Sequence, residues 1–248
     1  MRRVLLAFIT FILVFPAANG QFWKLKRYEV YGGVGTSQFF GDIGGYTPGK
    51  NAIGFKDIII SQTRFNTSVG MRYRIYETFS VKASFSYGML HASDETGSNV
   101  DRAYEATTSI IEPSVTAEYY FIKNKAEGSY RFSKGQRIFA SFFSMFDAYV
   151  YAGVAPVFYN VKPNDNLAAV IEKDGGVGLA FPVGLGANYV LSPNVMLGID
   201  LGLRYTTTDY LDGYTSQYSN SNDVYYFMTF VFTYKLKTAK NGLPSFRN

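Results

Sequence analysis

The most constraining feature of this chain is a strict two-residue alternation of apolar with small or polar side chains between residues 175 and 236. Residues 177–189 alternate Val, Leu, Phe, Ala or Tyr with Gly, Ala, Pro or Asn. Residues 195–206 repeat the pattern, with Asp200 and Arg204 among the polar positions. A period of two sustained over this length predicts β-strands. Soluble strands usually have about 5–6 residues, whereas tilted membrane-spanning strands need about 9–11, so these are predicted to cross a membrane.

The remaining sequence contains enough segments of the same kind to predict eight strands in all. Their expected ranges are about 28–40, 62–75, 79–90, 107–122, 148–159, 175–191, 195–210 and 224–236. Short links alternate with long polar loops, which is typical of outer-membrane barrels, and an even strand number places both termini in the periplasm. We therefore predict an all-β fold, an eight-stranded antiparallel transmembrane up-and-down β-barrel, integral to a bacterial outer membrane.

The main alternative is a soluble eight-stranded barrel of the lipocalin type. Such a barrel has an apolar interior and a polar exterior. In this chain, the charged residues occupy the strand face opposite the bulky apolar one. No charged row fits an apolar interior, so the pattern favours the membrane barrel.

The first twenty residues have the features of a secretory signal peptide. Arg2 and Arg3 precede an apolar run, 4–15, and a small-residue cleavage site, 18–20. We expect residues 21–248 to form one mature domain. Without the two arginines, 22 basic and 19 acidic residues remain, a formal charge of +3. This charge is too small to indicate a nucleic-acid partner, and the absence of Cys excludes a disulfide scaffold.

The inward strand face carries charges of both signs that are expected to meet in the lumen. These residues are Arg64, Arg72, Arg74, Lys82, Arg204 and Lys235 with Glu112, Glu118 and Asp200. An eight-stranded barrel has an interior just wide enough for side chains to fill. Unpaired buried charges are costly, so an ion-pair network is expected. The network is interpreted as a polar plug, with a cation-lined pore as the alternative.

The connection at residues 123–147 is expected on the periplasmic side of the barrel. Connections there are normally short, but this one is long. It is first basic and then apolar. We predict a partner contact there through Lys123, Lys125, Arg131, Lys134 and Arg137 together with Phe139, Phe142 and Phe143. Aromatic side chains of this kind often anchor interfaces. The alternative is that the segment folds back and caps the barrel.

The sequence does not contain a recognisable motif for a catalytic or metal site. The single histidine, His91, lies near Ser93 and Asp94, but there is no Gly-x-Ser-x-Gly motif, and a solvated loop histidine is the better interpretation. One His and no Cys do not supply the ligands of a zinc site, so none is predicted. The acidic segment 209–213 lacks the spacing of a calcium loop and is interpreted as a turn. No enzyme activity, cofactor, metal or small-molecule substrate is predicted.

Several segments resemble a known family of outer-membrane proteins. They are Gly41-Asp42-Ile43, residues 148–154 (AYVYAGV), residues 181–186 (FPVGLG) and residues 202–212 (GLRYTTTDYLD), the last being the most specific. The chain resembles the PorG-like family of small barrels, which includes a type IX secretion system component. The resemblance implies a non-enzymatic structural component that anchors a periplasmic ring complex to outer-membrane lipid. The alternative is a stand-alone small barrel, acting as a narrow channel or a surface-binding protein.

Overall fold

The computed structural model describes residues 22–44, 60–95, 100–123, 145–215, 222–239 and 241–245. Eight long strands make up the wall of the molecule. They are β1 (Tyr28–Phe40), β2 (Arg64–Tyr76), β3 (Phe79–Ser93), β4 (Glu105–Ile122), β5 (Phe146–Pro163), β6 (Gly175–Val190), β7 (Val195–Thr206) and β8 (Val224–Thr238). The predicted range of the first strand agrees with β1, whereas β4 and β5 are longer than predicted.

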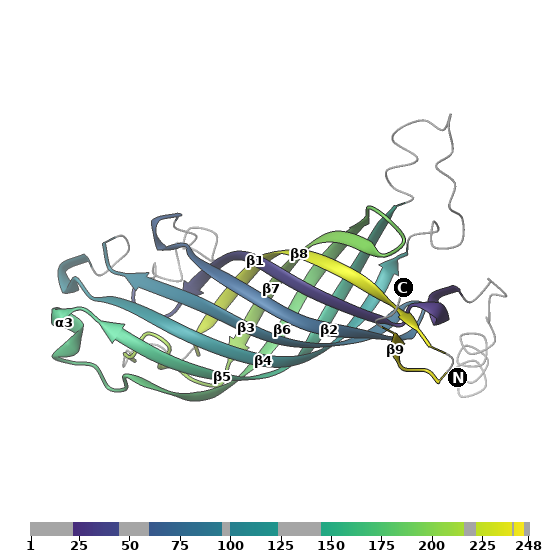
Figure 1. The fold of residues 1–248 in the computed structure, drawn as a ribbon. Helices are drawn as coiled ribbons and strands as arrows, with labels where there is room; N and C mark the ends of the chain where they lie inside the picture. Colours follow the sequence, from purple (N-terminus) through teal and green to yellow (C-terminus); the bar gives the residue numbers. More distant parts are fainter. Residues whose placement is uncertain are drawn as a thin grey trace, which may run out of the picture.

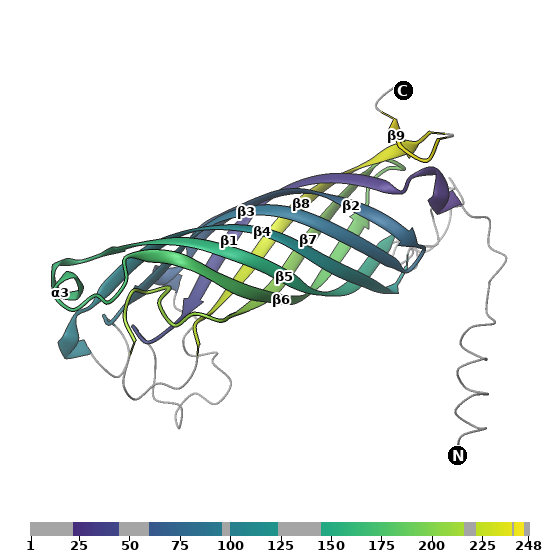
Figure 2. The same cartoon turned by 90° about the horizontal axis from the view of Figure 1, so that it is seen from below.

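The strands form one closed barrel. Each pairs antiparallel with its neighbour in sequence, and β1 also pairs with β8, from Tyr28 opposite Leu236 to Phe40 opposite Val224 (Figures 1 and 2). The predicted eight-stranded up-and-down barrel is therefore confirmed. Closure leaves no open sheet edge along the β1–β8 seam, as a strand structure in lipid requires.

Short elements mark the two ends of the barrel. η1 (Phe22–Leu25) and β9 (Pro244–Ser245) lie together at one end, which we call the termini end (Figure 1). η4 (Ile60–Gln62), η5 (Val100–Arg102) and α3 (Asp165–Ala168) lie at the opposite end, the loop end. No helix in the described ranges is long and apolar enough to cross a membrane. The predicted signal peptide, residues 1–20, lies outside the described residues.

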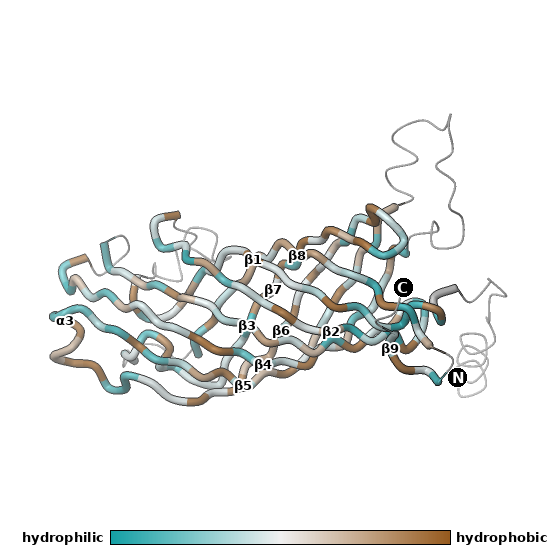
Figure 3. Tube along the Cα trace, in the orientation of Figure 1, coloured by the Kyte–Doolittle hydropathy of each residue, from teal (hydrophilic) through white to brown (hydrophobic). Residues whose placement is uncertain are grey.

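The outer surface of the wall is apolar around the barrel. Large hydrophobic side chains point outward from every strand, for example Val69, Phe85 and Phe230, which are 56%, 52% and 57% exposed. Figure 3 shows the resulting alternation of hydrophobic and hydrophilic residues along the strands. Outward aromatic residues lie near both ends, such as Tyr119 toward the termini and Tyr226 toward the loops. An exposed apolar belt between aromatic positions is the surface of a transmembrane barrel.

The loop end of the interior is packed with apolar side chains. We call one group the loop-end plug: Ile43, Leu90, Leu167, Leu211 and Tyr225, all at most 3% exposed. Two hydrogen bonds hold the backbone of Leu211. Its N–H donates to Asp223 at 2.7 Å, and its carbonyl accepts from the Thr108 hydroxyl at 2.5 Å. The segment after β7 is thereby held across the interior.

Candidate functional site

The lumen contains a connected network of buried ion pairs. We call it the lumen network: Glu29, Arg72, Arg74, Lys82, Glu118 and Asp200. Strand register explains the assembly, because Lys235, Glu29, Arg72 and Lys82 occupy directly opposed positions on β8, β1, β2 and β3. Opposed residues on one face of a sheet have Cβ atoms about 5 Å apart. A single row across four strands thus brings cations and carboxylates into contact.

Arg72 is the centre of this network. Its Nη1 donates to Glu29 at 2.8 Å, and its Nε and Nη2 donate to the two Glu118 oxygens at 2.5 and 3.1 Å. Arg74 reaches the other Glu29 oxygen at 2.6 Å. Arg72, Glu29 and Glu118 are at most 1% exposed, so each charge is compensated by partners rather than by bulk water.

Lys82 and Tyr149 connect the network to β7. The Lys82 ammonium lies 2.8 Å from Asp200 and 3.4 Å from Glu118. It also lies over the rings of Tyr31 and Tyr151, at 5.3 and 5.1 Å from their centroids. The Tyr149 hydroxyl donates to the second Asp200 oxygen. Around Lys82, side chains from β1, β3, β4, β5 and β7 therefore meet across the lumen.

A second charge pair lies nearer the loop end. Arg204 Nε is 3.4 Å from Glu112, and the Tyr225 hydroxyl donates to the same Glu112 oxygen at 2.5 Å. The Arg204 guanidinium lies over the Phe227 ring at 4.4 Å. Between this pair and the lumen network is a cavity of about 30 Å³, lined by Ser84, Ser86, Ser114 and Thr116 among others. That volume holds about two water molecules.

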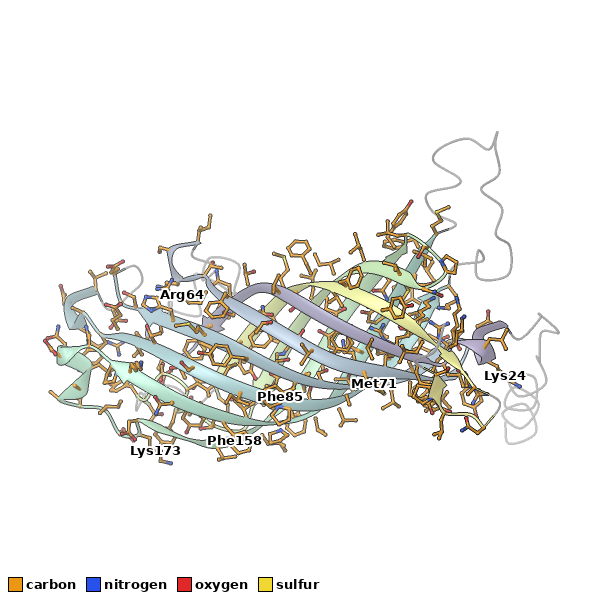
Figure 4. The ribbon with its side chains drawn as sticks, viewed as in Figure 1. Lys24, Arg64, Met71, Phe85, Phe158 and Lys173 are labelled. Carbon is orange, nitrogen blue, oxygen red and sulfur yellow. The ribbon has the colours of Figure 1, made fainter. Side chains whose placement is uncertain are left out.

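The predicted lumen residues do not all lie together. Arg72, Arg74, Lys82, Glu118 and Asp200 meet in the lumen network, while Arg204 and Glu112 form the separate pair. Lys235 is buried next to Glu29, whose carboxylate it attracts. Arg64 was predicted to face the lumen, and this prediction is wrong. Arg64 lies at the loop end of β2 (Figure 4), where its Nη1 donates to the carbonyls of Ser61 and Thr63, at 2.8 and 3.1 Å.

Two lumen residues were missed in the sequence. Glu29 joins two arginines, and Tyr149 joins Asp200 to Arg72. The alternation of β1 carries the signal for Glu29, since it shares an inward face with Tyr31 and Ser37. Tyr149 shares the inward face of β5 with Asp147 and Tyr151 in the same way.

The long connection is described only at its two margins. The Lys123 ammonium lies 3.0 Å from the buried Asp147 carboxylate and 4.7 Å from the centroid of the Tyr120 ring. This pairing holds the end of β4 next to the start of β5. The other predicted contact residues lie outside the described residues: Lys125, Arg131, Lys134, Arg137, Phe139, Phe142 and Phe143.

The loop end is ordered by buried carboxylates that accept backbone N–H groups. Asp212 accepts from the amides of Asp42, Ile43 and Tyr214, at 3.1–3.2 Å. Burial and the neighbouring Asp42 outweigh these donors and raise the pKa of Asp212 to about 7. Burial and the Asp212 charge also raise the pKa of Asp223. These carboxyls hold separate loops together over the plug.

The histidine segment does not assemble a catalytic triad. His91 Nδ1 lies 3.0 Å from the Thr107 hydroxyl, and its Nε2 lies 3.6 Å from Glu105. Ser93 instead accepts from the Glu95 amide at 3.2 Å, and Asp94 holds the Arg102 guanidinium at 2.9 and 3.0 Å. The described residues also contain no group of three or more His, Asp or Glu placed to hold a metal ion.

Solved structures similar to this chain include three bacterial surface barrels. Neisserial surface protein A has 10% identity, with 84% of this chain and 96% of that chain covered and a TM-score of 0.44. Ail, the attachment invasion locus protein of Yersinia pestis, has 11% identity, 85% and 97% coverage and a TM-score of 0.42. OprG from Pseudomonas aeruginosa has 10% identity, 85% and 94% coverage and a TM-score of 0.41.

No curated protein matches the sequence. The sequence model of one family, described as Domain of unknown function (DUF6089), matches residues 2–241. This match extends over the whole barrel, from β1 to the end of β8. The chain therefore belongs to the DUF6089 family.

Proposed function

We propose that this protein is a non-enzymatic outer-membrane barrel that anchors a periplasmic ring complex, as a structural component of a type IX protein-secretion apparatus. The observation that carries the proposal is the filled lumen. The loop-end plug, the Arg204–Glu112 pair and the lumen network follow one another along the axis. In a barrel filled in this way, the ends and the outer wall are available to bind partners, and the interior does not serve as a channel.

The termini end is the proposed contact with the ring complex. Its described cations are Lys24, Lys26, Arg27, Lys123 and Lys237, and the cations of the long connection add to them in the sequence. Exposed leucines accompany them, with Leu25 59% and Leu243 58% exposed. A cationic surface with apolar anchors suits an acidic protein partner. On this proposal, both termini lie in the periplasm.

A second candidate function is surface binding through the loop end. Carboxylates outnumber cations among the described residues there. The carboxylates at its surface are Asp42, Glu95, Asp101, Glu105, Asp165, Glu172, Asp174 and Asp209, against Arg64, Arg102, Lys162 and Lys173. Arg102 is itself fixed between the rings of Tyr104 and Tyr214, at 5.1 and 5.3 Å. An ordered acidic surface suits a basic partner outside the cell.

The test is affinity capture of the tagged full-length barrel from crosslinked outer membranes, read by mass spectrometry. Wild type is compared with K125E/R131E/K134E/R137E, which leaves the Lys123–Asp147 pair intact. The matched control is K173E at the loop end. We expect periplasmic ring proteins with wild type and the control, and their loss from the fourfold variant.

Secretion in a strain lacking the barrel provides the second readout. Loss of type IX cargo from the medium, restored by wild type and not by the fourfold variant, supports the anchoring role. Unimpaired secretion in that strain, with the barrel captured alone, would reject the role and favour surface binding.

A further inference from the structure

One sector of the outer wall changes from apolar to cationic at the loop end. His91, Thr107 and Lys162 are directly opposed on the outward faces of β3, β4 and β5, where Lys162 is exposed and His91 is 7% exposed. Lys162 is exposed, and it is the only cation among the described outward positions in the loop half of the wall. Opposed side chains on neighbouring strands are about 5 Å apart, so the three form a continuous row.

Arg64, the first residue of β2, follows the inward alternation of its strand but lies at its loop end, beside this row. Its strand ends beside the loop half of β3, and its charge is close enough to repel a protonated His91. Figure 4 places Arg64 toward the loop end of the wall, on the side where Phe85 and Phe158 are also seen. Two cations thus flank the Thr107 hydroxyl and the imidazole that contacts it at 3.0 Å.

Apolar side chains lie on the membrane side of the row, with one row of uncharged residues between. Ile111 is opposed to Tyr87 on one side and to Phe158 on the other, two rows closer to the middle of the barrel. Ile111 and Phe158 are 40% and 46% exposed. The row between holds Met89, Ser109 and Asn160, none of which is charged. Cations on the solvent side of an apolar belt lie at the depth of lipid head groups.

The opposite sector lacks this arrangement. At the same end, the outward positions of β6, β7, β8 and β1 carry Leu179, Phe181, Tyr205, Tyr226 and Phe40. Glu105 lies one position farther out than Thr107 and contacts His91 from the solvent side. The solvent side of the row therefore carries a carboxylate, whereas the described outward positions on its membrane side are uncharged.

We propose that Arg64, Lys162 and the Thr107–His91 pair bind the phosphate of an anionic membrane lipid, whose acyl chains lie along Ile111 and Phe158. Lys162 and Arg64 supply charge, and Thr107 supplies a hydroxyl donor. The apolar positions below the row favour a lipid phosphate over a free phosphate ion. This site is independent of the secretion role, since it lies on the outer wall rather than at the termini end.

Native mass spectrometry of the detergent-solubilised barrel provides the test. The full-length protein is titrated with dioleoyl phosphatidic acid and, separately, with phosphatidylcholine of the same chains. We expect wild type to prefer phosphatidic acid. One interfacial cation contributes enough attraction that K162Q should weaken this binding on the order of fivefold, and K162Q/R64Q by more than tenfold. K173Q is the matched control, because Lys173 is stacked on Tyr210 at 4.1 Å and lies outside the row.

The same titration in millimolar inorganic phosphate separates the two sources of a phosphate group. Persistence of phosphatidic acid binding supports a lipid site, whereas complete displacement would reassign it to free phosphate. Equal affinity for the two lipids, or an unchanged affinity in K162Q, would overturn the proposal. Lys162 is exposed, so K162Q is expected to fold, and its heat-modifiable gel mobility verifies this.

Discussion

At the scale of single residues, the lumen network depends on mutual compensation. Glu118 is fully buried and lies between Arg72 and Lys82. E118Q removes the carboxylate and leaves part of two cationic charges unpaired, so it should lower the free energy of unfolding by about 3–5 kcal/mol. Urea titration in lipid vesicles measures this. E77Q, in the exposed β2–β3 turn, is the control and should change stability little. Equal stability of E118Q and wild type would show that water compensates these cations.

The glycines of β1 differ in the space that is available for an added side chain. A Cβ on Gly35 would lie 1.8 Å from the Met228 carbonyl oxygen of β8, and backbone cannot move aside as a flexible side chain can. On Gly32, the nearest atoms would be 4.0 Å away. G35A should therefore destabilise the β1–β8 seam by about 1–3 kcal/mol, while G32A is tolerated. The folded fraction on a heat-modifiability gel distinguishes them, and matching fractions would contradict this packing.

The loop-end carboxyls predict a pH dependence. The pKa of Asp212 is raised to about 7, and that of Asp223 is raised too, so the folded loops favour the protonated forms. Their stabilisation is complete below the unfolded pKa, about 4, and is lost as pH rises through about 7. Amide exchange at Ile43, corrected for the intrinsic rate, should therefore accelerate from pH 5 to 8. In D212N/D223N, the corrected exchange should not vary with pH, and an unchanged pH dependence would refute the assignment.

At the scale of strands, depth in the membrane decides what the outer face tolerates. Phe230 on β8 is outward and lies in the middle of its strand, opposed to Val34 and Ile199. Asn160 is outward near the loop end of β5. F230R should cost about 2–4 kcal/mol and N160R about 0–1 kcal/mol in vesicle refolding. Comparable costs would indicate that the apolar belt does not define the lipid boundary.

At the scale of the whole molecule, the filled interior predicts an electrically silent barrel. The loop-end plug and the lumen network close the axis at separate levels, and the cavity between them holds only about two waters. Planar-bilayer recordings of the purified protein should show no stable unitary conductance at about 100 mV. Reproducible steps of one size, absent from E118Q preparations, would support the channel alternative instead.

The sequence by itself determined the barrel and much of its interior. A period of two and strand lengths suited to a membrane predict strand number, closure and the inward face, because side chains on a strand alternate strictly. Five of the predicted lumen charges, Arg72, Arg74, Lys82, Glu118 and Asp200, share one network. Glu29 follows the same alternation but is isolated among glycines and aromatics in β1, so its role is evident only beside β2 and β8.

Only the tertiary structure decided which groups touch. Register aligned Lys235, Glu29, Arg72 and Lys82 in one row, and strand alternation does not specify register between neighbours. Arg64 follows the inward alternation, yet it is the first residue of β2, where loop carbonyls are within reach of its guanidinium. The plug and the His91–Thr107–Lys162 row likewise join segments far apart in sequence. Such contacts depend on how strands and loops are arranged in space, which a local pattern does not encode.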